Sequence, residues 1–237
     1  MPGATTPVPP AADLDEASRV RRGEADRLNV AFITSATEIV GERLRAFSRR
    51  RPDVQIKLHE GFTVDVLAAL ERGTADVGTV RDAEERDDID LSLLTTERFV
   101  AGIPTEHPSA RNDHAEATAL AADPLILFPR TAGARAFDVN TQPLRDAGID
   151  VQVAQEFSNW HTNIMFVAAG LGVTIAPCSV TTLLPAGTRR LELDGPPTAS
   201  RIFMAAHRGD NRPLVQAFIA ASESVTGRRH NRTTSTR

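Results

Sequence analysis

The chain has 237 residues, of which 41% are hydrophobic and 24% charged, so it is long enough to bury one large core or two smaller ones. A formal net charge of −4 argues against a surface dedicated to nucleic acid, and the single cysteine, Cys178, excludes an internal disulfide and a cysteine-rich metal site. No apolar run is long enough to span a bilayer, and no basic segment followed by an apolar one opens the chain. The sequence therefore predicts a cytoplasmic protein without membrane contact.

Strand and helix patterns begin to alternate near residue 28. Residues 1–27 are rich in Pro, Ala and Thr and then in charge, and we expect them to be disordered or the remnant of a linker helix. In the first set of elements, a predicted helix follows each of the first two strands. The predicted strands are Leu28–Ile33, Val54–Leu58 and Asp76–Val80, and a long extended segment follows over Leu91–Ile103.

A second set of elements repeats this alternation. Its predicted strands are Leu125–Phe128, Val151–Phe157 and Val173–Ala176, its helices lie at about Phe137–Ala147 and Asn159–Ala169, and late strands at Arg189–Leu193 and Ile202–Ala206 precede a helix that opens at Pro213. Between the second of these helices and the next strand, Gly170 and Gly172 leave almost no loop, as is typical of an α/β crossover. The pattern predicts an α/β fold in two lobes, with mixed sheets and helices on both faces. Residues 227–237 are expected to form a mobile basic tail.

Five segments resemble, in order and spacing, the effector-binding half of LysR-type transcriptional regulators. They are Leu28–Phe32, Phe47–Val54, Leu67–Gly78, Pro104–Ala110 and Ala168–Pro177. This resemblance covers residues 28–225 and implies a type 2 periplasmic-binding-protein-like fold, with lobe one at 28–103 plus 207–226 and lobe two at 104–206. It also implies a small carboxylate effector, no cofactor, no enzymatic activity, and a homodimer or homotetramer formed through this domain.

Finer features resemble the branch of that family that senses aromatic-degradation acids such as muconate. They are Val80-Arg81, Leu127-Phe128-Pro129-Arg130 and Gln155-Glu156. The helix-turn-helix that opens such regulators is not found in this sequence, so we expect no specific DNA binding from this chain by itself. The sequence leaves open whether the chain is a fragment or a truncated relative.

In a two-lobed binding fold the ligand lies between the lobes, where helix N-termini offer free N–H groups and a positive dipole end to a carboxylate. The resemblance matches Ser35 and Thr63 to effector-binding positions of the family and places the loop 128–131 in its pocket region. Arg81, at the end of a strand, is either a ligand contact or a hinge-side ion-pair partner for the acidic loop 82–90. The predicted effector site comprises Thr34, Ser35, Thr63, Arg81, Phe128, Pro129, Arg130, Asn159 and His161.

Most of these residues have a structural alternative. Ser35 and Glu38 fit the S-x-x-E capping box, and Thr63 and His161 could also cap helices. Arg130 could be a solvated loop residue, whereas for Trp160 packing is favoured over ligand contact.

The chain lacks the sequence motifs of several other function classes. The histidines show no metal-ligand spacing, and the acidic loop 82–90 lacks the calcium-loop pattern, so no metal is expected. Neither a G-x-S-x-G elbow nor a phosphate loop of the Walker type is found, so the sequence predicts no enzyme. The remaining alternatives are a partner that forms mixed dimers with full-length regulators and a solute-binding protein.

Overall fold

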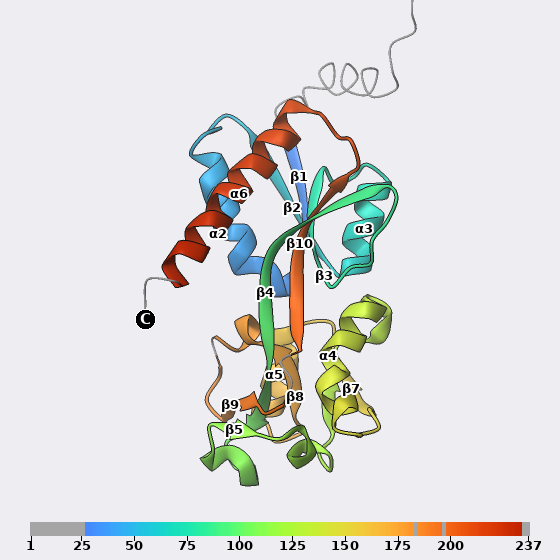
Figure 1. The fold of residues 1–237 in the computed structure, drawn as a ribbon, viewed down its shortest axis with the longest axis vertical. Coiled ribbons are helices and arrows are strands. Elements are labelled where there is room, and N and C mark those ends of the chain that lie inside the picture. Colours follow the sequence, from blue (N-terminus) through green and yellow to red (C-terminus); the bar gives the residue numbers. More distant parts are fainter. Residues whose placement is uncertain (1–26, 183, 196–197, 234–237) are drawn as a thin grey trace, which may run out of the picture.

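A computed structural model describes residues 27–182, 184–195 and 198–233, so the expected disordered or linker segment lies almost wholly outside the described residues. The chain forms two lobes, one above the other in Figure 1, joined by two long strands, β4 (Ile89–Pro104) and β10 (Ala199–His207). The first half of β4 pairs with β10 in the first lobe, and its second half pairs with β8 and β9 in the second. One strand therefore belongs to the sheets of both lobes.

The first lobe is a five-stranded sheet in the order β2-β1-β3-β10-β4. β1 (Arg27–Ile33), β2 (Gln55–Gly61) and β3 (Val77–Arg81) are parallel, whereas β10 is antiparallel to both of its neighbours. Figure 1 shows α3 (Thr63–Glu71) on one face of this sheet and α2 (Thr37–Ser48) with α6 (Pro213–Thr233) on the other.

A glycine sets how closely α3 packs on this sheet. A Cβ placed on Gly78 of β3 would lie 2.4 Å from the Val66 Cγ1 of α3. Only the absence of a side chain at this position lets the helix lie directly on the strand.

The second lobe extends the sheet and adds a small one. β8 (Thr174–Pro177) and β9 (Thr188–Leu193) pair with β4, and β5 (His114–Ala115) pairs with β9. The other strands and helices of this lobe are β6 (Leu125–Leu127) and β7 (Val153–Glu156), which pair in parallel, α4 (Ala134–Asp146) and α5 (Trp160–Ala168). Short 3-10 helices are η1 (Thr34–Ala36), η2 (Pro108–Arg111), η3 (Ala117–Leu120), η4 (Arg130–Ala132) and η5 (Cys178–Thr181).

Each lobe has its own hydrophobic core. The core of the first lobe includes more residues from the C-terminal part of the chain than the sequence predicted. Ile202 and Met204 of β10 lie in the core of the first lobe, although the sequence assigned residues 199–206 to the second. The physical reason is that β10 pairs with β3 along most of its length, which the pattern of β10 alone does not reveal. No helix among the described residues is long and apolar enough to cross a membrane.

The final helix also differs from expectation. α6 continues to Thr233, where the sequence predicted a mobile tail from residue 227, and residues 234–237 lie outside the described part. After Pro213 only Gly227 interrupts a run of residues compatible with a helix, so no strong signal ends it earlier.

The short connection between α5 and β8 is as the sequence predicted. Gly170 has a φ of +78° and Gly172 a φ of +155°, both unfavourable for a residue with a side chain. A Cβ placed on Gly172 would lie 2.1 Å from the Pro124 carbonyl oxygen, which accepts a hydrogen bond from the Val173 N–H at 2.9 Å. This close approach brings the start of β8 against the chain that leads into β6.

Candidate functional site

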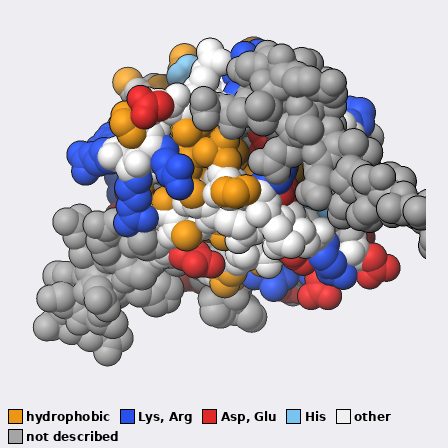
Figure 2. Space-filling model, turned by 90° about the horizontal axis from the view of Figure 1, so that it is seen from above, with side chains coloured by type: hydrophobic (Ala, Val, Ile, Leu, Met, Phe, Trp, Pro, Cys, Tyr) orange, Lys and Arg blue, Asp and Glu red, His pale blue; other side chains and the backbone are white. Residues whose placement is uncertain are grey.

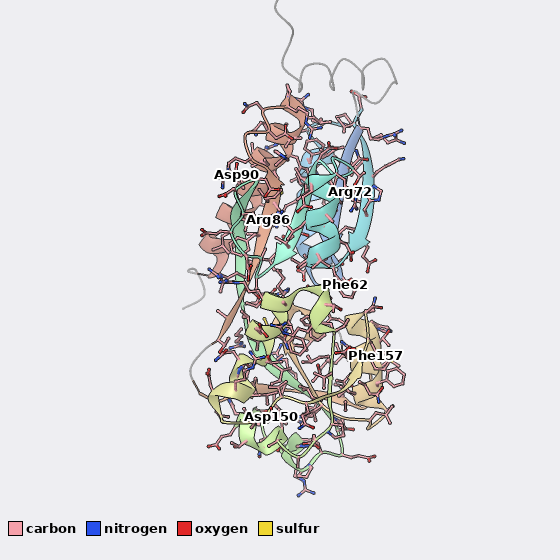
Figure 3. The ribbon with its side chains drawn as sticks, turned by 90° about the vertical axis from the view of Figure 1, so that its right-hand side faces the viewer. Phe62, Arg72, Arg86, Asp90, Asp150 and Phe157 are labelled. Carbon is pink, nitrogen blue, oxygen red and sulfur yellow. The ribbon has the colours of Figure 1, made fainter. Side chains whose placement is uncertain are left out.

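Two helix N-termini, one from each lobe, meet at the boundary between the lobes. α3 begins at Thr63, directly after Phe62, which Figure 3 shows at the level where the lobes join. α4 begins after Gly133, and a Cβ placed on Gly133 would lie 3.5 Å from the Thr63 Cβ. The first backbone hydrogen bonds of these helices run from Val66 to Phe62 and from Phe137 to Gly133, so the N–H groups of both first turns have no acceptor within their helices.

The Ser35 hydroxyl of η1 is held by Arg81 rather than used as a helix cap. Arg81 Nε donates to Ser35 Oγ at 3.1 Å, and α2 has no side-chain hydrogen bond at its N-cap, Ala36. The capping box that the sequence offered for Ser35 and Glu38 is therefore not formed. Because Ser35 Oγ accepts this bond, its own proton remains available to donate to a ligand.

Thr63 is also tied to Arg81, through the backbone of that residue. Thr63 Oγ1 accepts from the Arg81 N–H at 3.2 Å and lies 3.4 Å from the Arg81 carbonyl oxygen, to which it donates only weakly. The N-cap of α3 is Phe62, whose N–H donates to the Asp65 carboxylate at 2.9 Å, so Thr63 is not the cap. Ser35, Thr63 and Arg81 thus form one hydrogen-bonded group.

The guanidinium of Arg81 is buried at the crossing of the two long strands. Its Nη1 donates to Ser200 Oγ at 2.7 Å and pairs with Glu97 Oε2 at 3.0 Å. Ser179 of η5, in the second lobe, donates to the same Glu97 oxygen at 3.0 Å. Glu97, Ser179 and Ser200 were missed from the sequence because they lie on segments that carry no motif. Of the two roles left open for Arg81, these contacts favour the hinge-side ion pair, although its partner is not the acidic loop.

Asp82 extends this polar group beneath Ser200. Its carboxylate accepts from Ser200 Oγ and from the Arg201 N–H, both at 2.8 Å. Burial raises the pKa of Asp82 above its usual range, and these hydrogen bonds together with Arg81 oppose that shift. Asp82 also has a φ of +46°, which is uncommon for a residue with a side chain and is maintained here by the two hydrogen bonds.

The loop predicted to form the far wall lies at the start of η4 and α4. Phe128 packs edge-to-face on Phe137 and on Trp160, with ring centroids 5.9 Å and 5.6 Å apart, so Trp160 has the packing role favoured from the sequence. Pro129 precedes η4. The exposed Arg130 binds Asp138 through two nitrogens at 3.2 Å and 2.7 Å, and this hydrogen bonding lowers the pKa of Asp138.

The side-chain hydrogen bonds of Thr34 and Asn159 go to other residues than Ser35, Thr63 and Arg81. Asn159 caps α5, because its Oδ1 accepts from the His161 N–H at 2.7 Å, and the His161 side chain is exposed. Thr34 donates to the Glu60 carboxylate at 2.7 Å, so its proton is already engaged with an anion. In the described part of the chain, no group of three or more His, Cys, Asp or Glu residues could hold a metal ion.

A family model described as the LysR substrate binding domain matches residues 21–226. The chain belongs to this family. The curated relatives that this chain matches are HTH-type transcriptional regulators rather than enzymes. The uncharacterized HTH-type regulator YnfL of Escherichia coli K12 is 33% identical over 165 residues, which are 69% of this chain and 56% of that protein. CatR of Pseudomonas putida is 27% identical over 86% of this chain and 71% of its own length.

Solved LysR effector-binding domains share the fold. The effector-binding domain of QuiR in complex with shikimate gives a TM-score of 0.76 at 17% identity, over 85% of this chain and 97% of that one. The BenM effector-binding domain with its effector benzoate gives a TM-score of 0.73 at 18% identity, over 86% of this chain and 93% of that one. The type 2 periplasmic-binding-protein-like fold implied by the sequence is therefore confirmed.

Proposed function

We propose that this LysR domain senses a small carboxylate held between its two lobes. The observation that carries the proposal is the approach of the α3 and α4 N-termini at Thr63 and Gly133. Two sets of free N–H groups and two positive helix-dipole ends then face one ligand. Together they can stabilise an anion although no positively charged side chain contacts it. Ser35 adds a hydroxyl proton from the first lobe.

The chemistry beside this anion site favours an acid with a compact apolar body. Phe128, on the loop before η4, forms an aromatic group with Phe137 and Trp160 on the second-lobe side. Among its structural neighbours, one holds benzoate and another shikimate, both ring carboxylates. Arg81 and Arg130 are bound to Glu97 and to Asp138, so in this proposal they position neighbouring groups rather than contact the acid.

The proposed mechanism is a shift between lobe arrangements. A carboxylate that contacts helix ends of both lobes stabilises the arrangement in which these ends lie together, and so shifts the population toward it. In a cytoplasmic LysR-type regulator this change would be transmitted to DNA-binding segments, either of the same protein or of a full-length partner in a mixed dimer. Both routes require the same ligand site.

Thermal stabilisation by ring carboxylates tests the proposal directly. We expect benzoate, shikimate or a related acid to raise the melting temperature in a concentration-dependent way, whereas benzyl alcohol does not. A ligand at about one hundred times its dissociation constant adds about 2.7 kcal/mol of stability. The double variant Ser35→Ala with Thr63→Val should lose most of this shift, because both hydroxyls are then removed.

Two controls separate binding from folding. Thr63→Val also removes the acceptor for the Arg81 N–H, so the melting temperature without ligand is compared first, with Thr63→Ser as the variant that keeps the hydroxyl. Thr105→Val, on an exposed turn, should leave the ligand shift unchanged. A panel without effect on the wild-type chain, or an equal shift in the double variant, would contradict the proposed function.

We further propose that the domain self-associates through an apolar face of the second lobe. Met165, Phe166 and Leu171, in and after α5, are 45%, 37% and 52% exposed. Phe166 stacks on Phe157, which Figure 3 shows at the outer side of that lobe. The edge strand β2 of the first lobe carries an equally exposed Leu58. In a two-fold dimer, the α5 face of each protomer would pack against the β2 edge of the other. The same contact would therefore form twice.

A charge on this face should abolish the dimer. Phe166→Glu is expected to convert dimers into monomers in sedimentation experiments, because an ionised carboxylate would be desolvated at the interface. Leu93→Glu, at a similarly exposed apolar residue of β4, is the matched control. Unchanged dimers in the α5 variant would exclude this surface.

A further inference from the structure

One carboxylate oxygen at the hinge is hydrogen-bonded from both lobes. Glu97 Oε2 accepts from Arg81 Nη1 of the first lobe at 3.0 Å, and from Ser179 Oγ of η5 in the second lobe, also at 3.0 Å. The Arg81 and Glu97 side chains are largely buried, so water competes little for these bonds. The Glu97 carboxylate therefore connects the polar group of the first lobe to the start of η5.

Glu97 lies close to the point where β4 changes partners. It is in the part of β4 that pairs with β10, whereas Phe99, slightly further on, pairs with Pro177 of β8. η5 follows Pro177 directly, so it moves with the second lobe. Because Arg81 holds the Glu97 carboxylate in the first lobe, a change in the angle between the lobes displaces Ser179 from that carboxylate. A hydrogen bond weakens steeply when its length or direction changes in this way.

The other side-chain contact from the second lobe to this part of β4 is exposed. Arg98 pairs with Glu192 at 3.0 Å, but the Arg98 side chain is 62% exposed. Exposed ion pairs contribute little to stability, whereas a hydrogen bond to a buried ionised group contributes more. Of these two described contacts, the bond from Ser179 to Glu97 is therefore the one expected to restrain the lobes.

We propose that the bond from Ser179 to Glu97 is a latch, which holds the lobes in the arrangement where the N-termini of α3 and α4 meet. Loss of the bond increases the population of arrangements in which these N-termini are apart. The consequence for ligand affinity rests on the proposed function. A carboxylate that needs both helix ends binds more weakly to a chain that spends less time in the latched arrangement.

The single cysteine of the chain can report on the latch without any ligand. Cys178 directly precedes Ser179 and is half-buried. Burial, together with the negative charge of Glu97, raises the pKa of the Cys178 thiol, so little of the reactive thiolate is present. Both effects diminish when η5 moves away from Glu97. Opening of the latch should therefore speed the reaction of Cys178 with iodoacetamide.

Variants of η5 test the latch by the rate of this alkylation. Ser179→Ala removes the donor and should speed the reaction at least about tenfold, because a hydrogen bond to an ionised group is worth about a tenfold change in population. Ser179→Thr keeps a hydroxyl and should react as the wild-type chain does. Thr182→Val is the matched control, since it removes only the bond at 2.8 Å from Thr182 Oγ1 to the Ser179 carbonyl oxygen. This control should leave the rate nearly unchanged.

A distance between the lobes provides a second measurement. Arg72 and Asp150 are exposed, and Figure 3 shows them in the first and the second lobe, respectively. Spin labels at Arg72→Cys and Asp150→Cys in a Cys178→Ser chain give this distance by double electron–electron resonance. We expect Ser179→Ala to shift or broaden the distance distribution, and Thr182→Val to leave it as in the parent chain.

The latch is overturned if Ser179→Ala alkylates no faster than the wild-type chain, if Thr182→Val speeds the reaction equally, or if the distance distribution does not change. Failure of the proposed function gives a different result, in which no ring carboxylate stabilises the wild-type chain although the latch variants still differ without ligand. If both proposals hold, benzoate or shikimate slows the alkylation of Cys178 in the wild-type chain, and Ser179→Ala binds the same acid more weakly.

Discussion

Replacing Arg81 with methionine is expected to lower the free energy of unfolding by about 3–5 kcal/mol, because the substitution leaves the Glu97 carboxylate buried without its counter-charge. The two side chains are only 7% and 9% exposed, and the same guanidinium also binds Ser35 and Ser200. Urea unfolding monitored by circular dichroism gives the measurement. The effect should exceed that of removing any exposed ion pair of the chain, for which about 0–1 kcal/mol is typical.

A double variant provides the control for this result. Arg81→Met combined with Glu97→Leu removes both charges and should recover a large part of the lost stability, because the carboxylate of residue 97 is then no longer buried without its counter-charge. The single and the double variant could instead prove equally stable. The ion pair between Arg81 and Glu97 would then not be the interaction that connects Ser35, which Arg81 binds, to Ser179 of η5, which Glu97 binds. The double variant should still bind carboxylates more weakly, since Ser35 would lose the donor that orients it.

Replacing Gly172 with alanine is expected to prevent the second lobe from packing. The added Cβ would lie 2.1 Å from the Pro124 carbonyl oxygen, well inside van der Waals contact, at a φ of +155°. Either the hydrogen bond from Val173 to that oxygen breaks or the start of β8 moves away from β6. We expect a loss of more than about 4 kcal/mol, seen as poor recovery of soluble protein or an early unfolding transition.

Gly170 provides a control only two residues away. It also has a positive φ, +78°, but a Cβ there meets nothing within 4 Å. Gly170→Ala should therefore cost only the backbone penalty of about 1–2 kcal/mol and leave the chain folded. Equal stability of the two alanine variants would show that the close approach to Pro124 is not the reason for the glycine at 172.

The sequence predicted the elements well wherever local pattern decides them. β1 and α5 lie within one or two residues of their predicted bounds, because β-branched alternation and helical spacing are local properties. The long segment expected from Leu91 is β4, two residues longer at its start and one at its end. The fold class followed from the order of these elements together with the family resemblance.

Long-range pairing could not be predicted in the same way. Ser35 fits a capping box with Glu38, and only the fold brings Arg81, 46 residues further on, to its hydroxyl. Ser200 lies 119 residues from Arg81 in a strand without any motif. The missed contributors to the site are thus those whose partners are distant in the chain.

The course of the chain through the two lobes has a consequence for how such domains diversify. The second lobe is one uninterrupted insertion that the chain enters along β4 and leaves along β10, and Arg98 and Ala199 at these two points are paired neighbours. Both junctions therefore lie side by side in one ladder, outside the core of the first lobe. Recombination at these positions would exchange the whole second lobe between related genes, and with it the second-lobe side of the proposed ligand site, while the first lobe keeps its packing.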